Sequence, residues 1–546
     1  MLFFFKEITV DYYKDALHNT ILAKTHCSAS QQRSNTTIER RTAVHLNILT
    51  RTKYNIIAKT HCSASQLKTK KMELTRLIVK GGVISPGELR EIVNMALEQS
   101  LETISFGSRQ DIIFPKGFQG NTAEKIGKHH FVYPNEKSGN NIVSSYVATD
   151  IFSNTPWLTG NKFLYILEQF KENPKLKVNI TDPKQQIVPL FTGHINFIAS
   201  HHEDYWFLYV RLPKWDKMEL FPVLIYSWDI GKIYYEIEKI LQEEPDTIDM
   251  IFQLVSDLDT NNRTIDQPLN ISFYPFPYYE GMNRLGIDQY WLGLYWRNNL
   301  YDLQFLKEMC DLCFDCKIGK ICITPWKSFI VKGIPKERKL DWEKFLGKKG
   351  INVRHSLLEL NWHLPVAMEW ALNLKTFLVR TLDQFDISTY GLTFGLSDYN
   401  REGHYFTSIV IERNESPKDL ESIKIRDTFN ILHAKNFDPN TREYIVHAQD
   451  VDKLELPNIL IELSKKYFEE LGTSVLEFQN AKTKKETKTL DIHQCQECLT
   501  VYNSEYGDTI QGIEKGTLFK DLPEDYCCSL CEAPKSSFTP LEEAKV

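Results

Sequence analysis

Cys495-Gln496-Glu497-Cys498 and Cys528-Ser529-Leu530-Cys531 form two C-x2-C pairs near the C-terminus, and 29 residues separate them. Each pair places two thiols on one tight turn, so two such turns can close a tetrahedron around one ion. A tetrahedral set of four thiolates favours iron or zinc. The pairs therefore predict a four-cysteine metal site with a small domain folded around it.

The residues between and after the two pairs bear on the choice between iron and zinc. They occur in this order: Tyr502, Tyr506-Gly507-Asp508, Gly512, Gly516-Thr517, Phe519, Asp521-Leu522-Pro523, Asp525-Tyr526, Ala533-Pro534-Lys535 and Phe538. The run resembles rubredoxin over nearly all of residues 493–546. The resemblance implies one iron ion, Fe²⁺ or Fe³⁺, held by Cys495, Cys498, Cys528 and Cys531. It also implies that Cys527 is not a ligand and that the core is aromatic, made of Tyr502, Phe519, Tyr526 and Phe538.

Two positions depart from the rubredoxin pattern. Leu499 and Glu532 stand where rubredoxins usually have glycine, which takes positive φ without steric cost. Another residue there costs roughly 1 kcal/mol, whereas a four-thiolate site releases on the order of 10 kcal/mol on metal binding. We therefore expect the site to form.

Ahead of this domain, residues 72–480 contain one structural unit twice. In the first copy, Ser85-Pro86-Gly87-Glu88 has the pattern of a helix N-terminus with a capping box. The expected helix leads to a strand at 103–106, a polar corner at 107–110 and a strand at 112–114. In the second copy, a helix at 302–316 leads to a strand ending at Thr324-Pro325-Trp326-Lys327 and a strand at 329–331.

These stretches resemble the ferredoxin-like half-domains of sirohaem nitrite and sulfite reductases. The resemblance implies an α/β (α+β) multidomain fold, with an α/β segment after each half-domain. We expect a first reductase-like half at 72–285, a second half at 286–480, a linker at 481–492 and the rubredoxin domain at 493–546. In that family Arg109 matches an arginine that faces the anion, and Lys327 replaces a glutamine. Both are candidates for binding an anionic ligand, although a salt bridge explains Arg109 equally well.

The cysteines of that family are missing here. Its C-x5-C and C-x3-C motifs hold a 4Fe–4S cluster beside sirohaem, but residues 350–470 contain no cysteine. Because cluster iron needs thiolate ligands, we expect both sirohaem and the 4Fe–4S cluster to be absent. Cys310, Cys313, Cys316 and Cys322 could replace the ligands, but three of them lie on an expected helix. Core packing is the preferred interpretation.

Composition limits the remaining possibilities. Of the net charge of −6, residues 1–71 contribute +8 and the other residues −14, which gives no support for nucleic-acid binding. No apolar run is long enough to span a membrane, and the apolar run at residues 1–5 is too short for the core of a signal peptide, so we expect a cytoplasmic protein. We expect Met72 to be the true start and residues 1–71 to be a non-native or disordered extension.

The sequence thus predicts an iron-binding electron-transfer protein, in which a reductase-like body, residues 72–480, is tethered to a rubredoxin domain. Its redox partner should present a basic docking surface, because residues 493–546 carry a formal charge of −6. Two alternatives stay open. In one, the chain is an oxidoreductase whose body binds a cofactor or anionic substrate and is supplied by its own rubredoxin. In the other, it is a zinc-ribbon interaction protein.

Overall fold

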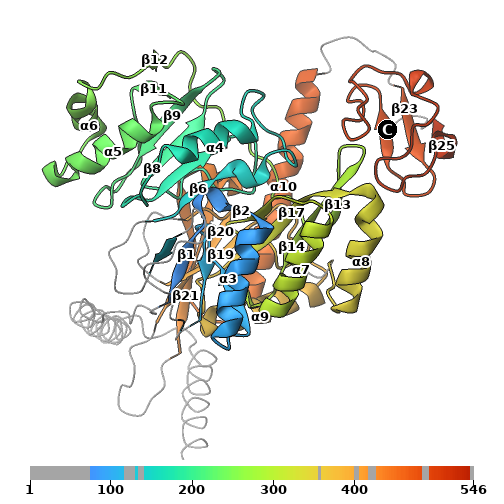
Figure 1. Ribbon diagram of the computed structural model, residues 1–546, viewed down its shortest axis with the longest axis horizontal. Helices are drawn as coiled ribbons and strands as arrows, with labels where there is room; N and C mark the ends of the chain where they lie inside the picture. The colour runs from blue at the N-terminus through green and yellow to red at the C-terminus, as the bar shows by residue number, and fades with distance from the viewer. Residues whose placement is uncertain are drawn as a thin grey trace, which may run out of the picture. The chain divides into compact units, whose positions relative to one another are not determined.

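In the computed structural model, the described part of the chain comprises residues 74–115, 118, 130–132, 140–353, 358–398, 405–415, 426–482 and 491–540. Residues Glu73–Val546 form one compact unit, and many of its helices and strands are labelled in Figure 1. The expected extension 1–71 and most of the expected linker 481–492 lie outside the described residues. Within those residues, no helix is both long and apolar enough to cross a membrane.

The first half-domain begins with the predicted helix cap. Ser85 Oγ accepts a hydrogen bond from Glu88 N at 3.2 Å, and Ser85 N donates to Glu88 Oε2 at 3.0 Å. This reciprocal pair satisfies two backbone donors that the first turn leaves free. The elements are β1 (Arg76–Ile78), β2 (Val83–Ile84), α3 (Pro86–Glu98), β3 (Thr103–Phe106), β4 (Ile112–Ile113) and β5 (His130–Val132).

The two half-domains exchange strands. The second copy comprises β13 (Gly281–Leu285), β14 (Gln289–Tyr295), β15 (Tyr301–Asp302), α7 (Leu303–Asp315), β16 (Ile321–Ile323), β17 (Ser328–Pro335) and α8 (Lys339–Lys348). Its β15 pairs with β3 of the first copy, and β2 of the first copy pairs with its β16. The sheet orders are β15-β3-β4-β1-β5 and β13-β14-β17-β16-β2, so each sheet holds strands of both copies. One buried core accordingly draws on both.

An α/β segment follows each half-domain, and the two segments share one pattern of strand directions. In the first, β6 (Ile142–Ser144), β7 (Val178–Thr181) and β8 (Ile195–Ala199) are parallel, and β9 (Tyr205–Val210) and β11 (Val223–Tyr226) follow antiparallel. In the second, β18 (Trp362–His363), β19 (Phe394–Asp398) and β20 (Ile409–Asn414) are parallel, and β21 (Thr428–Ala434) and β22 (Tyr444–Val451) follow antiparallel. This shared pattern is the clearest structural sign of the duplication.

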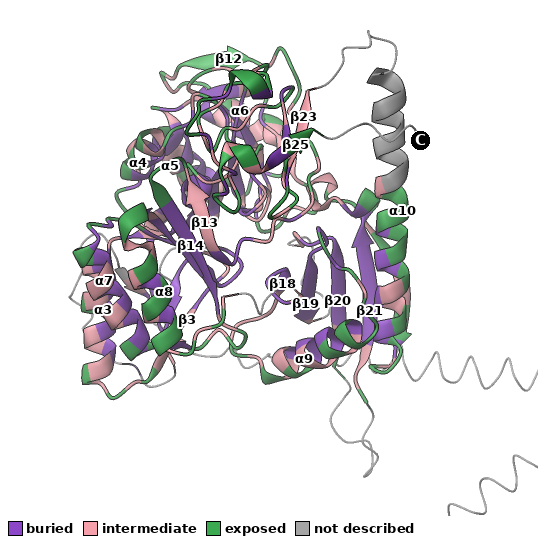
Figure 2. Cartoon of the chain, turned by 90° about the vertical axis from the view of Figure 1, so that its right-hand side faces the viewer, coloured by how far each residue is buried: buried purple, intermediate pink, exposed green. Residues whose placement is uncertain are grey.

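The bounds of the first segment are β6 (Ile142–Ser144), α4 (Gly160–Glu168), β7 (Val178–Thr181), β8 (Ile195–Ala199), β9 (Tyr205–Val210), β10 (Glu219–Leu220), β11 (Val223–Tyr226), α5 (Ile230–Ile240), α6 (Ile248–Val255) and β12 (Asn262–Thr264). Those of the second are β18 (Trp362–His363), α9 (Glu369–Gln384), β19 (Phe394–Asp398), β20 (Ile409–Asn414), β21 (Thr428–Ala434), β22 (Tyr444–Val451) and α10 (Leu456–Lys482). Figure 2 shows β19 to β21 as almost wholly buried, and leucines of α9 and of the described part of α10 pack against them.

The C-terminal domain is a three-stranded sheet with long connecting loops. Its strands are β23 (Ile492–Cys495), β24 (Val501–Asn503) and β25 (Phe538–Pro540), in the order β24-β23-β25. Its core contains the four predicted aromatic residues together with two of the cysteines, Cys495 and Cys528. The small sheet and the aromatic core therefore hold the two cysteine turns in place.

Candidate metal centre

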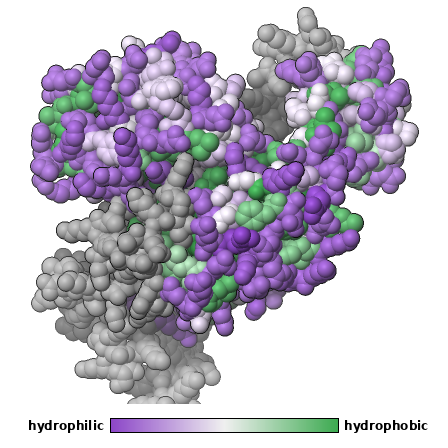
Figure 3. Space-filling view, viewed as in Figure 1, coloured by the Kyte–Doolittle hydropathy of each residue, from purple (hydrophilic) through white to green (hydrophobic). Residues whose placement is uncertain are grey.

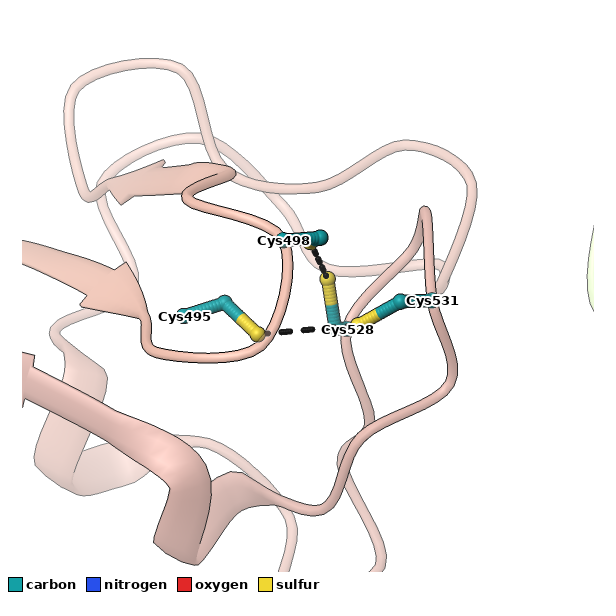
Figure 4. Close-up of side chains that lie close together, drawn as sticks. All are labelled: Cys495, Cys498, Cys528 and Cys531. Atoms are coloured by element: carbon teal, nitrogen blue, oxygen red, sulfur yellow. Dashed lines mark hydrogen bonds between the residues drawn. The ribbon is translucent and has the colours of Figure 1, made fainter.

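The four predicted cysteines come together from two loops. Cys495 ends β23 and Cys498 lies in the turn that follows, while Cys528 and Cys531 lie on the loop before β25. Their side chains point toward one another in Figure 4, and all four Sγ atoms lie within 4.8 Å of one another. The cysteines are not joined by disulfides.

The spacing of the sulfur atoms fits a tetrahedral metal site. Sγ of Cys495 lies 3.6 Å from Sγ of Cys531, and Sγ of Cys498 lies 3.5 Å from Sγ of Cys528. Metal–sulfur bonds of about 2.3 Å give a tetrahedron whose edges are about 3.8 Å. The thiols are therefore close to the positions in which one ion would hold them.

Both cysteine turns use the unusual backbone that the sequence indicated. Leu499 has φ +62° and Glu532 has φ +64°. The N–H of each donates 2.9 Å to the carbonyl of the first cysteine of its pair, Cys495 or Cys528. The turns are therefore closed at the expected steric cost.

We expect Leu499→Gly to stabilise the domain by about 0.5–1 kcal/mol, because glycine removes the steric cost of positive φ. Leu499 is 65% exposed, so little apolar burial is lost. The measurement is the temperature at which the metal-bound domain loses its visible absorbance. Leu499→Ala is the matched control, because it shortens the side chain but keeps the strained backbone. Equal shifts in both variants would contradict this explanation.

Thr500 was not predicted from the sequence as part of the site. Its Oγ1 lies 3.1 Å from Sγ of Cys498. The hydrogen bond from this hydroxyl, with one from its backbone N–H, lowers the pKa of Cys498 to about 6. The position therefore favours the thiolate form, which is the form that binds metal.

The prediction that Cys527 is not a ligand agrees with its place in the structure. It is not among the four converging cysteines, and its Sγ accepts a hydrogen bond from Gln511 Nε2 at 3.3 Å. It also forms an isolated β-bridge with Pro534. The Cys527 thiol thus lies beside the metal centre and outside it.

In the body, the guanidinium of Arg109 donates hydrogen bonds to other residues of the protein. Its Nη1 donates to Oδ1 of Asn179 at 2.8 Å, and its Nη2 donates to the backbone carbonyls of Asn141 and Val178 at 2.7 and 2.8 Å. Burial lowers its pKa to about 9. Among the described residues, Nε of the guanidinium is buried without a partner, and the other nitrogens join the corner to Asn141 and to β7.

Lys327 has a different environment. It is buried at φ +56°, and its Nζ has no hydrogen-bond partner among the described residues. Burial, reinforced by the nearby charge of Lys375, lowers its pKa to about 7. Gln110 takes the matching place in the first copy, at φ +59°, and its amide bonds to Ser144 and Ile323. Arg109 and Lys327 were both predicted to bind an anion. Of the two, Lys327 is the one whose amine makes no hydrogen bond to the described residues.

Core packing is confirmed for the four cysteines of the second half-domain. Cys310, Cys313 and Cys316 belong to the core shared by the half-domains, whereas Cys322 belongs to a different apolar cluster. Burial raises the pKa of Cys310 to about 12. Their sulfur atoms are not among the converging groups found in the described residues.

A second group of possible metal ligands lies at the surface. His201, His202 and Asp266 converge, with Nε2 of His202 2.9 Å from both carboxylate oxygens. Asp266 and His201 are exposed, and a hydrogen bond between His202 and Asp266 accounts for the close contact.

The aromatic stretch at 273–279 packs between the halves. Phe276 and Tyr279 are buried in a cluster with Trp291 and Trp326. Beside them is a cavity of about 70 Å³, which is lined by residues including Gln185, Phe276, Trp326, Thr393 and Phe406. Cofactor pockets usually measure about 300–1,000 Å³, so the cavity would hold only a few atoms.

Comparison with known proteins places the body and the C-terminal domain separately. The body resembles the solved structure of the NirA protein of Mycobacterium tuberculosis, with a TM-score of 0.53 and 14% identity, over 71% of this chain and 79% of that one. This likeness confirms the expected fold of the sirohaem-reductase type.

The C-terminal likeness is closer. The rubredoxin family model matches residues 492–538. A probable rubredoxin, HupI, from Bradyrhizobium diazoefficiens is 37% identical over 65 residues, which are 12% of this chain and 94% of that protein. Rubredoxin-2 of Desulfovibrio desulfuricans is 42% identical over 55 residues, which are 10% of this chain and 89% of that protein. Through this C-terminal domain, the chain belongs to the rubredoxin family.

Proposed function

We propose that this protein binds one iron ion at Cys495, Cys498, Cys528 and Cys531 and transfers electrons one at a time. The observation that carries the proposal is the convergence of these four sulfur atoms within a rubredoxin domain. Iron held there would supply one-electron exchange between its ferric and ferrous states. A site closed by four protein ligands leaves no position for a substrate, so a partner is needed at each end of the transfer.

The burial of the cysteines indicates where electrons enter and leave. Cys495 and Cys528 are buried, while Cys498 is half-buried and Cys531 is exposed. The exposed side chains of Leu499 and Leu530 follow and precede these outer cysteines. A partner that covers the two leucines would approach the metal with little intervening protein.

Charge supports a basic redox partner. The domain carries a formal −6, and Figure 3 shows mostly hydrophilic residues on the visible face of the described part of the molecule. Opposite charge speeds encounter more than it strengthens the complex. Because metal binding requires these four cysteines to be reduced thiolates, we also propose a reducing compartment such as the cytoplasm.

Metal analysis and spectroscopy of the full-length protein test the proposal. We expect one iron per chain, a red oxidised form and reversible bleaching on reduction. Stoichiometric zinc in a colourless native protein would support a zinc-ribbon interaction protein instead and would refute electron transfer.

The oxidoreductase alternative is favoured by one observation, the buried Lys327 amine, which has no hydrogen-bond partner among the described residues of a body that resembles the NirA structure. We nevertheless expect neither sirohaem nor acid-labile sulfide after purification from a host that makes sirohaem, because residues 350–470 contain no cysteine. Absorbance and sulfide analysis of the intact chain check this. A sirohaem spectrum would make the body a reductase with the rubredoxin as its electron donor.

A further inference from the structure

Glu532, the residue after the last cysteine of the metal site, contacts the body. Its Oε1 accepts hydrogen bonds from the Tyr290 hydroxyl at 2.5 Å and from Arg284 Nη2 at 2.9 Å. The Arg284 side chain is only 9% exposed and Tyr290 only 4%. Two buried donors on β13 and β14 thus converge on one carboxylate oxygen.

Further contacts surround this pair. Arg284 also hydrogen-bonds to Cys527, and the Lys339 amine lies 4.9 Å from the centre of the Tyr290 ring. At the tip of the same hairpin, Ile287 lies beside Gly512 of the rubredoxin domain. The β13–β14 hairpin therefore contacts the rubredoxin domain at Gly512, Cys527 and Glu532.

The residue at position 532 is itself informative. Its φ of +64° favours glycine, so glutamate stabilises the local turn less than glycine would. The side chain gains charge-assisted hydrogen bonds that glycine cannot make, and such bonds are the stronger kind. The steric cost falls on the turn itself, whereas the hydrogen bonds that offset it are made with the body.

We propose that the β13–β14 hairpin is a docking surface for the protein's own rubredoxin domain, with Glu532 as the anchor and Arg284 and Tyr290 as its receptors. Lys339 adds positive charge to the same surface. The docked domain keeps Leu499 and Leu530 exposed, at 65% and 71%. This inference builds on the proposed function, because the docked domain would present its outer edge to an external redox partner.

Small-angle X-ray scattering of the full-length protein tests the docking. Glu532→Gly is the main variant, because it removes the anchor and relieves the turn, so the domain should stay folded. Hydrogen bonds to a charged group contribute more than those between neutral groups. Loss of the bonds from Tyr290 and Arg284 should lower the ratio of molecules with a docked rubredoxin domain to molecules with an undocked one about ten-fold or more. The radius of gyration should rise accordingly.

A second set of variants reverses the charges of the two partners in the contact. Arg284→Glu should also release the domain, and combining it with Glu532→Arg should restore compact scattering. Arg380→Glu, at an exposed position of α9, is the matched control and should scatter like the wild type. Identical scattering of Glu532→Gly and the wild type would overturn the proposal, as would failure of the swap to restore compactness.

Metal analysis of the same samples separates this result from the proposed function. Glu532→Gly should retain its metal and its colour. An undocked variant with intact iron supports docking, whereas zinc in every sample would refute electron transfer without affecting the scattering comparison.

Discussion

Replacement of Cys495 or Cys531 by serine is expected to abolish stoichiometric iron binding and the red colour. Each cysteine supplies one of the four sulfur atoms that lie within 4.8 Å of one another. Metal binding to comparable thiolate sites releases on the order of 10 kcal/mol, so the domain depends on the ion for most of its stability. We expect it to unfold or to become readily cleaved by proteases.

The control is Cys527→Ala, which changes a neighbouring cysteine outside the group. It should retain iron and absorbance, because this thiol is not among the converging ligands. Iron content and the visible spectrum are compared across the three variants after anaerobic purification. Full iron retention in Cys495→Ser would show that the ligand set is wrong.

The second large effect concerns pH and Lys327. Its pKa is lowered to about 7 in the folded protein from an ordinary value of 10.5. Between these values the unfolded chain binds more protons than the folded one, so stability rises with pH. The slope is at most about 1.4 kcal/mol per pH unit for one proton. Denaturant unfolding of the body at pH 7, 8 and 9 should show this rise.

Lys327→Met should flatten that slope and stabilise the protein by about 1–4 kcal/mol at pH 7, because an apolar side chain of similar length replaces a buried charge. An unchanged slope in the variant would assign the effect to Lys332 and Lys375, whose pKa values burial also lowers. A loss of stability would show that the Lys327 amine is held by a group other than its described neighbours.

Sequence reasoning succeeded where the determinants are local. The cap at Ser85, the helix that follows it and the positive φ of Leu499 and Glu532 all depend on residues within a few positions of one another. The four metal-site cysteines were found for the same reason, because each pair occupies one turn. The family resemblance supplied the aromatic core that surrounds the pairs.

It failed where the partner is distant. Arg109 bonds to Asn179, 70 residues away, and Glu532 bonds to Tyr290, 242 residues away. Nothing in the local sequence signals either contact. The environment of the Lys327 amine could not be predicted from the sequence either. Whether it has a hydrogen-bond partner among the described residues depends on every element that packs around it.

The strand exchange between the half-domains also affects the order of events during synthesis. Strand β2 is made early, but its partner β16 ends at Ile323, about 240 residues later. At roughly 5–20 residues per second, the ribosome reaches that point about 10–50 s afterwards. During that interval β2 lacks the strand with which it pairs. The first half-domain therefore completes its strand pairing only after the second has been made.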